Sequence, residues 1–199
     1  MRVSFKSPQL VRLARLLPAG VAKRFIREQD GAAALEFAIV MFPFFALIFA
    51  IMETSLIFLA SQTLETAAAE SGRLIFTGQA QGAKLTQAAF QEQVCNRIYA
   101  LFDCRNNLKV DVRQYDKFDA AKFQRPEVDE EGNFKGDFVY DPAGPGCITV
   151  VRLYYQWPLT LPLGGFETAR LPGDKLLLAA TAAFRNEPYG NVETCKTTS

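Results

Sequence analysis

The sequence predicts an α+β protein: one amino-terminal transmembrane helix that extends into a small extracytoplasmic domain, with a second helix and a small, mostly antiparallel sheet. Three observations predict this fold. Residues 37–52 carry no charge and are almost entirely apolar. A stretch rich in Ala, Leu and Glu with helical periodicity follows them. Beyond residue 107, segments rich in β-branched and aromatic residues are separated by Gly and Pro.

The apolar run is long enough to cross a membrane. As a helix, residues 32–53 would rise about 33 Å, and a hydrocarbon core is about 30 Å thick. Inside a bilayer a lone segment satisfies its backbone hydrogen bonds only as a helix. Pro43 removes one of these bonds and should bend the helix, which membrane helices tolerate. The alternative is a buried helix of a soluble protein, and the flanking charges argue against it.

The charges around this run predict its orientation. Residues 1–30 contain seven basic and two acidic residues, a net charge of +5, whereas the whole chain has a net charge of +1. Basic residues beside a span stay in the cytoplasm, so the chain after about residue 60 should lie outside. A cleaved secretory signal is the rival interpretation, but its apolar core would be only about 7–15 residues long. Phe58-Leu59-Ala60 also lacks the small residues of a cleavage site.

Composition excludes several functional classes. The chain contains no histidine, which removes Ser/His/Asp and Cys/His catalysis and histidine-ligated zinc. A net charge of +1 does not provide the excess of positive charge that is typical of nucleic-acid-binding proteins. The segment DEEGNFKGD does not have the spacing of an EF-hand calcium loop, so we interpret it as a solvated loop. We expect no catalytic residue, no cofactor and no metal site.

All four cysteines, Cys95, Cys104, Cys147 and Cys195, lie on the predicted outer side. That compartment is oxidising in most cells with this topology, which favours disulfides. Four cysteines allow three pairings. Cys95 with Cys104 closes the shortest loop and leaves Cys147 with Cys195, and reduced, buried thiols are the alternative.

The sequence on both sides of the span also contains candidate helical segments. Before it, residues 1–30 form either a short amphipathic helix on the membrane surface or a disordered tail. After it, the helix continues through residues 61–76, with small and apolar side chains recurring at spacings of three and four. This stripe packs either on a neighbouring helix or on the chain's own domain. Residues 85–102 read as a second helix that Thr86 caps.

The remainder reads as strands. In residues 108–115, apolar and polar side chains alternate, as in a strand with one buried face. Residues 147–157 are rich in β-branched and aromatic residues, and Pro158 ends that strand. Residues 175–184, KLLLAATAAF, have a helix-like composition. We predict a strand there because it would complete the sheet and because Pro172-Gly173 forms a turn before it. Residues 116–146 are charged and rich in Gly and Pro, which indicates a long loop.

The entry to the membrane holds the candidate functional site. Gly31 directly precedes the span, and Glu36 is a lone carboxylate within its apolar sequence. In one interpretation, Glu36 lies near enough to the interface to reach water. In the other, a membrane peptidase cuts after Gly31, and Glu36 pairs with the new amino group of Ala32, of this chain or of a neighbour. An unpaired carboxylate in lipid is costly, which favours such pairing.

This arrangement resembles type IV prepilins, which have a basic leader, a glycine, a glutamate at the fifth mature position and a long apolar helix. The pair Glu36-Phe37 is similar to the Glu-Tyr of Flp pilins. The sequence also resembles the TadE-like family of pilus-assembly proteins. The parts that carry this resemblance are GAAALEFAIVMFPFF, Glu53, Gln62, the segment AAAESGR, and the distal VRLYYQWPLTLPL and ATAAFRNEPY. The resemblance covers most of residues 25–190, with the loop 116–146 outside it.

The resemblance implies a minor-pilin-like or pseudopilin-like bacterial protein that takes part in assembling a Flp/Tad (tight adherence) pilus or a related secretion apparatus, and not an enzyme. Its expected parts are a cytoplasmic leader (1–31), a transmembrane helix (32–60) and a periplasmic domain (61–199), anchored in the inner membrane. Its expected partners are the membrane, other Tad/Flp proteins and a prepilin peptidase, with no nucleic acid. The alternatives are an uncleaved, anchored envelope-binding protein and, with less support, a membrane-tethered hydrolase.

Overall fold

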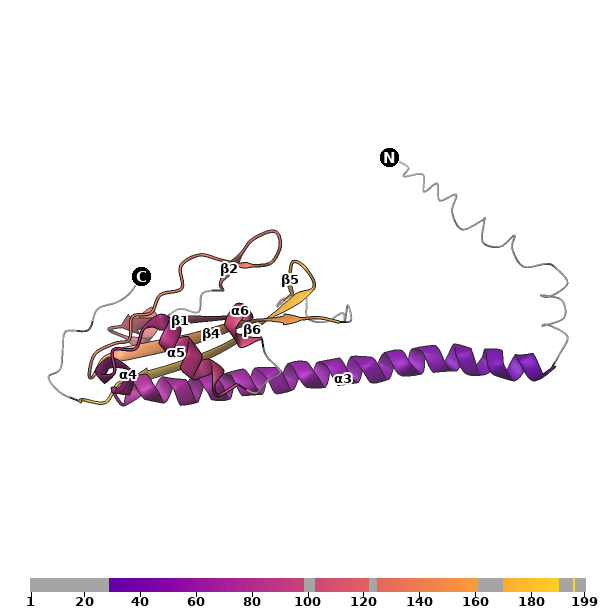
Figure 1. Ribbon diagram of the computed structural model, residues 1–199, viewed down its shortest axis with the longest axis horizontal. Helices are drawn as coiled ribbons and strands as arrows, with labels where there is room; N and C mark the ends of the chain where they lie inside the picture. The colour runs from indigo at the N-terminus through magenta and orange to yellow at the C-terminus, as the bar shows by residue number, and fades with distance from the viewer. Residues whose placement is uncertain (1–28, 99–102, 122–124, 161–169, 190–194, 196–199) are drawn as a thin grey trace, which may run out of the picture. The chain divides into compact units, whose positions relative to one another are not determined.

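The computed structural model describes residues 29–98, 103–121, 125–160, 170–189 and 195 (Figure 1). The chain divides into two compact units, Met1–Ile51 and Met52–Ser199. One helix, α3 (Gln29–Phe76, 48 residues), begins in the first unit and continues into the second. The second unit combines helices with an antiparallel sheet, so the predicted α+β class is confirmed.

Helix α3 ends where the sequence predicts a break. Gly78 has φ 75°, a left-handed conformation that glycine adopts without steric cost. Three short helices follow: α4 (Gln79–Gly82), α5 (Gln87–Cys95) and α6 (Cys104–Asn107). Thr86 caps α5 as predicted, because its hydroxyl accepts a hydrogen bond from the N–H of Ala89 at 3.3 Å.

The second helix is shorter than its apolar pattern predicts. We expect a helix over residues 85–102, but α5 stops at Cys95, and residues 99–102 lie outside those described. Cys95 bonds to Cys104, which begins a separate helical turn, and this link requires the chain to turn back. The described residues 96–98 form a turn and a bend, so the apolar pattern extends past the end of α5.

The main sheet has the strand order β1-β4-β6-β5, with every neighbouring pair antiparallel. Its strands are β1 (Leu108–Tyr115), β4 (Ile148–Pro158), β5 (Arg170–Leu171) and β6 (Lys175–Arg185). The three predicted strands are present. β6 is a strand despite its Ala- and Leu-rich sequence because it pairs with β4 along its full length, from Lys175 opposite Pro158 to Arg185 opposite Ile148.

The long connection between β1 and β4 carries a little structure of its own. It holds a 3₁₀ turn, η1 (Phe118–Ala120), and a small hairpin of β2 (Glu127–Val128) and β3 (Phe134–Lys135). Its last part lies beside β1, where Val112 donates to the carbonyl of Val139 and accepts from the N–H of Asp141. The predicted loop is thus fixed to the sheet at this point.

The core lies between one face of the sheet and helices α3 and α5. On α3 the buried positions recur at spacings of three and four: Glu53, Ile57, Ala60, Leu64, Ala67, Ala68, Ser71 and Ile75. The small-residue stripe therefore packs within the chain's own domain, one of the two predicted alternatives. From α5, Phe90 and Val94 are fully buried. The alternate residues Leu176, Leu178 and Ala180 of β6 face them.

Close approach of α3 to β6 depends on Gly72. A Cβ atom built on Gly72 would lie 2.9 Å from Cε1 of Phe184 and 3.7 Å from Cβ of Ala182. We predict that Gly72→Leu destabilises the domain by about 1–3 kcal/mol, because the added side chain must displace Phe184 or the strand. Urea unfolding of the full chain in detergent, followed by the fluorescence of its one tryptophan, Trp157, measures this.

Gly82→Leu is the matched control. A Cβ on Gly82 meets nothing within 4 Å, so this variant should unfold within about 0.5 kcal/mol of the parent. Equal stability of the two variants would mean that α3 and β6 are not packed as described.

Candidate functional site

The first half of α3 presents large apolar side chains to its surroundings. The exposed members include Leu35, Phe37, Val40, Phe42, Phe44, Leu47, Phe49 and Ile51. Phe42 keeps 80% of its surface exposed, a state that water disfavours and a lipid environment accepts. Within the described residues, one helical stretch, Ala33–Phe76, is long and apolar enough to cross a membrane, and none of its most apolar window is buried.

The predicted site residues lie at the start of this helix. Gly31 and Ala32 belong to the first turns of α3, and Glu36 is exposed one turn further along. Residues four apart on a helix are neighbours on its surface, so Ala32 and Glu36 lie on one side of α3. The basic leader, residues 1–28, lies outside the described part of the chain.

Glu53 marks the point where α3 enters the folded domain. It directly follows the uncharged residues 37–52, yet only 8% of its surface is exposed. Its Oε1 accepts a hydrogen bond from the backbone N–H of Thr160 at 2.6 Å. A charged acceptor makes this bond stronger than a bond between neutral groups. Glu53 thus ties the first turn of the packed part of α3 to the chain just after β4.

The two disulfides are Cys95–Cys104 and Cys147–Cys195, which are the pairs that the shortest-loop argument favours. The first joins the end of α5 to α6 across nine positions. The second joins residues 48 positions apart and holds Cys195 beside the start of β4. Cys147 is 2% exposed, so this link lies within the fold.

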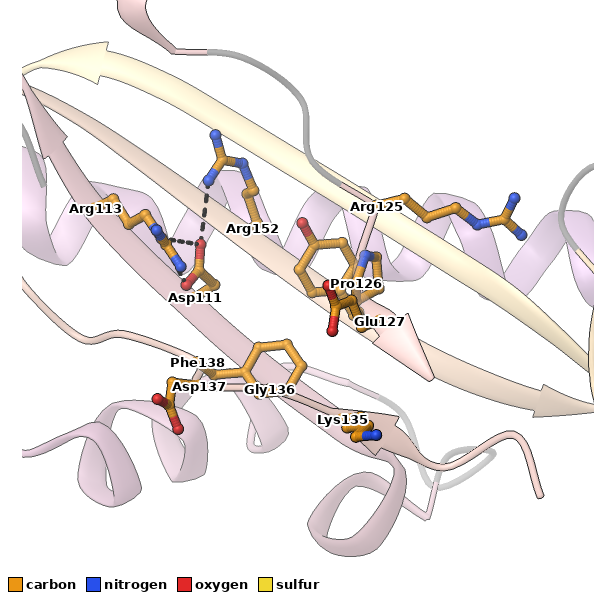
Figure 2. Close-up of a pocket in the computed structure, with 11 residues that line it drawn as sticks. Asp111, Arg113, Arg125, Pro126, Glu127, Lys135, Gly136, Asp137, Phe138 and Arg152 are labelled. Carbon is orange, nitrogen blue, oxygen red and sulfur yellow. Dashed lines mark hydrogen bonds and ion pairs between the residues drawn. The ribbon is translucent and has the colours of Figure 1, made fainter. Parts of the chain in front are cut away.

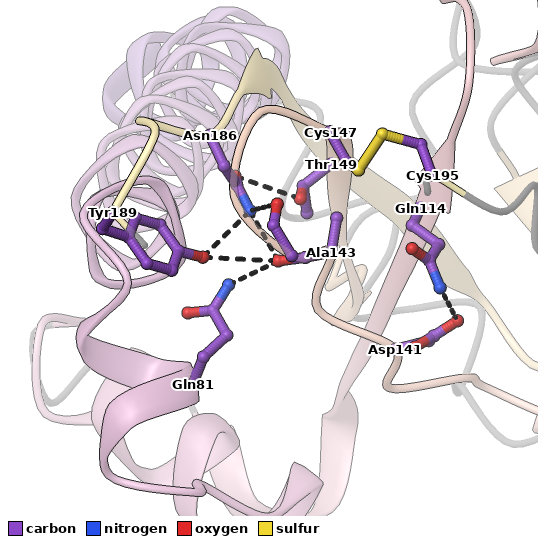
Figure 3. Close-up of a disulfide and its surroundings, with 10 residues drawn as sticks. Gln81, Gln114, Asp141, Ala143, Cys147, Thr149, Asn186, Tyr189 and Cys195 are labelled. Atoms are coloured by element: carbon purple, nitrogen blue, oxygen red, sulfur yellow. Dashed lines mark hydrogen bonds between the residues drawn. A yellow bond between two sulfur atoms is a disulfide. The ribbon is translucent and has the colours of Figure 1, made fainter. Parts of the chain in front are cut away.

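Asn186 organises the chain around the second disulfide (Figure 3). Its Nδ2 donates to the carbonyl of Ala143 at 2.6 Å, and its Oδ1 accepts from the hydroxyl of Thr149 at 3.2 Å. Gln81 also donates to the carbonyl of Ala143, at 2.7 Å. Asn186 is 3% exposed, and these bonds satisfy a buried amide. Sequence analysis missed this residue, since nothing local distinguishes it from a loop asparagine.

A second buried polar cluster lies on the sheet face opposite the helices (Figure 2). Asp111, 4% exposed, accepts from Arg113 Nε and Arg152 Nη1 at 3.1 Å each. Its Oδ1 also accepts from the backbone N–H of Val139 at 3.0 Å. Both arginines therefore share one carboxylate, which also holds the long connection against β1.

Arg152 stays charged in this cluster. Burial acts to lower its pKa, but the hydrogen bonds to Tyr115 and Asp111 raise the pKa above its ordinary value. The guanidinium lies 5.9 Å from the centre of the Tyr115 ring, within the range of a cation–π contact. A paired, hydrogen-bonded charge is the form in which buried ions are stable, because removing either partner leaves an uncompensated charge.

The cluster borders a cavity of about 520 Å³ between the sheet and the β2–β3 hairpin. A hydrolase would need carboxylates that converge on a substrate. Both oxygens of Asp111 are already occupied by Arg113, Arg152 and Val139. Figure 2 shows the carboxylate of Asp137 pointing away from Asp111. Asp111 therefore links β1, β4 and the long connection between them, and it offers no acid–base pair for catalysis.

Comparison with known proteins adds one match. A family model described as TadE-like protein matches residues 31–73, which run from Gly31 through the apolar segment to the packed stripe of α3. No curated protein matches the chain, and no solved structure does. The resemblance drawn from the sequence is thereby confirmed over this segment.

The loop lengths of the two disulfides predict different contributions to stability. Replacing Cys147 and Cys195 by serine should cost about 4 kcal/mol in the free energy of unfolding, and replacing Cys95 and Cys104 about 2.7 kcal/mol, because the longer loop frees more unfolded chain. Urea unfolding of both double variants tests the order. Thiol labelling of the parent under denaturing, non-reducing conditions is the control, and four labelled cysteines in protein from the outer side of the membrane would rule out both bonds.

Proposed function

We propose that this chain, whose residues 31–73 match a family model described as TadE-like protein, acts as a minor-pilin-like or pseudopilin-like component in assembling a Flp/Tad pilus or a related secretion apparatus. The observation that carries the proposal is the extent of the match. It includes the membrane entry with Gly31 and Glu36, the apolar segment, and the stripe of α3 that packs on the sheet. One helix therefore joins the expected membrane part to the domain's core.

In this role the chain works by association, not by catalysis. The exposed apolar half of α3 supplies a surface for lipid and for neighbouring helices. The domain that begins near Met52 supplies a folded unit to meet other components outside the membrane. In membranes, helices associate through packing and through polar contacts, and a single carboxylate such as Glu36 can decide which partner fits.

The orientation we propose places the leader in the cytoplasm and the domain in the periplasm, with α3 crossing the inner membrane. Its support is the charge of +5 on residues 1–30 and the two disulfides of the domain. The division into a leader (1–31), a span (32–60) and a domain (61–199) belongs to the same proposal. The packed stripe that starts at Glu53 suggests that the domain reaches back into the last turns of this span.

Processing is the second part of the proposal. A prepilin peptidase would cut between Gly31 and Ala32, and the freed amine would lie one helical turn from Glu36. Attraction between the two charges would be strong in lipid, where neither is well solvated. The amine can belong to this chain or to a neighbouring subunit, and in the second case the pair sets the axial position of one helix against the next.

Variants of Glu36 and Gly31 test this proposal. Glu36→Gln should leave membrane insertion intact but reduce pilus production, because the partner charge is left unmatched. Glu36→Asp should be intermediate, since the charge remains but reaches less far. Gly31→Leu should yield a product that retains residues 1–31. Pilus yield and protein size on denaturing gels are the measurements.

Glu65→Gln is the matched control. Glu65 is exposed on the same helix, beyond the apolar segment, and this variant should behave like the parent. Normal pili with Glu36→Gln, together with an unchanged protein size for Gly31→Leu, would leave an uncleaved membrane anchor in place of the proposed function.

A further inference from the structure

The outward face of α3 stays apolar for two turns after the domain begins. Four large apolar side chains in these turns keep between 42% and 67% of their surface exposed: Met52, Leu56, Phe58 and Leu59. All four belong to the same compact unit as the sheet. On the other side of these turns, Ile57 and Ala60 are buried in the core of the domain. This part of α3 therefore has one packed side and one apolar side that the fold leaves exposed.

The exposed side of α3 changes character after Ala60. From there to the end of the helix, the exposed residues are polar, charged or alanine: Gln62, Glu65, Thr66, Ala69, Glu70 and Arg73. Between Met52 and Ala60, the exposed polar residues are Thr54 and Ser55. A membrane helix tolerates such hydroxyls, because they can bond to a backbone carbonyl one turn earlier. The apolar surface thus ends at Leu59.

The length of the apolar stretch supports the same boundary. As a helix, the uncharged residues 37–52 would rise only about 22 Å, whereas the hydrocarbon core of a bilayer is about 30 Å thick. Residues 37–59 would rise about 33 Å, which spans that thickness at the usual tilt of about 20°. Contact with lipid that continues to Leu59 therefore completes a span that residues 37–52 leave too short.

We propose that lipid covers the outward face of residues 52–59, so that the edge of the domain packed on these turns lies within the leaflet of the membrane on the domain's side. At 100° per residue, the four exposed apolar side chains cover an arc of about 160° around the helix. The seam along which one helix packs on another is narrower, whereas lipid surrounds whatever the domain leaves exposed. The inference rests on the proposed crossing of the membrane by α3, and it adds that the folded domain itself enters the lipid.

Immersion of this edge explains the burial of Glu53. Glu53 is the one charged residue between residues 37 and 59, and it would lie about 9 Å inside a boundary at Leu59. An ionised side chain in contact with hydrocarbon is costly. The domain prevents that contact, because Glu53 is only 8% exposed and accepts its hydrogen bond from the backbone N–H of Thr160. The chain after β4 thus shields this carboxylate from lipid.

Trp157 lies near the level of the proposed boundary. β4 runs antiparallel to α3, since its end lies beside Glu53 and the strand paired with its start lies against Gly72. Trp157 precedes Thr160 by three residues, at most about 10 Å of strand. This length is close to the roughly 9 Å of helix from Glu53 to Leu59. Tryptophan is enriched where lipid meets water, so its position at this edge agrees with the proposal.

Tryptophan quenching in vesicles tests the proposal, because Trp157 is the one tryptophan of the chain. The full chain is reconstituted in phosphatidylcholine vesicles, with lipids brominated on their acyl chains as the quencher in lipid and acrylamide as the quencher in water. Trp157 should lose more fluorescence to bromines near the headgroup than to bromines near the chain ends, and little to acrylamide. If brominated lipid causes no loss of fluorescence, this edge of the domain lies outside the lipid and the proposal is wrong.

Tryptophans moved onto α3 test the helix itself. In chains that carry Trp157→Phe, Leu59→Trp should be quenched by bromines near the headgroup, and Phe49→Trp, near the middle of residues 37–59, by bromines near the chain ends. Ala69→Trp is the matched control, because this exposed position lies about 15 Å beyond Leu59 and should be quenched by acrylamide alone. Should Trp157→Phe disturb the fold, the quenching of Trp157 in the parent chain decides the matter alone.

The outcomes separate this inference from the proposed function. If Leu59→Trp escapes both quenchers, a second copy or another protein covers this face, and the inference is wrong. If lipid quenches Phe49→Trp but only acrylamide quenches Leu59→Trp, the inference fails while the crossing of the membrane stands. If lipid does not quench Phe49→Trp, both the crossing and the inference fail.

Discussion

The packing of one face of α3 on the sheet is the contact on which the rest of this structure depends. From Glu53 to Ile75 the buried positions follow one another at helical spacing and meet alternate residues of β4 and β6. Ala67, Ala68 and Gly72 leave room for the strand to approach, and a larger side chain at Gly72 would meet the ring of Phe184. The same helix continues back to Gln29, so the core of the domain and the expected membrane segment contain parts of one helix.

Around this contact, polar groups hold the outer parts of the domain in place. Glu53 fixes the chain after β4, Asp111 fixes the long connection after β1, and Asn186 fixes the tail after β6. Each is buried, and each bonds to a backbone group or a charged side chain far away in sequence. The disulfide of Cys147 and Cys195 acts near the third of these points. These contacts fix segments that lie outside the modest core of a domain of this size.

The local elements of this arrangement can be predicted from the sequence, but the contacts between distant residues cannot. The stripe through Leu64, Ala68 and Ile75 is readable because helical periodicity is a property of neighbouring residues. Whether it packs on its own domain or on a partner depends on distant strands, and that choice stays open until the fold is known. The contact of Glu53 with Thr160 spans 107 positions in the sequence, and no local sequence pattern predicts it. β6 shows the same limit, because its composition favours a helix and its pairing with β4 makes it a strand.

The central claim is that α3 passes from lipid to the core of the domain at Glu53. Spin labels placed singly along α3 in the full chain, reconstituted in lipid vesicles, test it through their accessibility to oxygen and to a water-soluble nickel chelate. Labels at Phe44 and Ile51 should be accessible to oxygen, a label at exposed Gln62 should be accessible to the chelate, and one at buried Leu64 should be protected from both. Accessibility to the chelate at Phe44, or lipid-like accessibility through Gln62, would contradict the account.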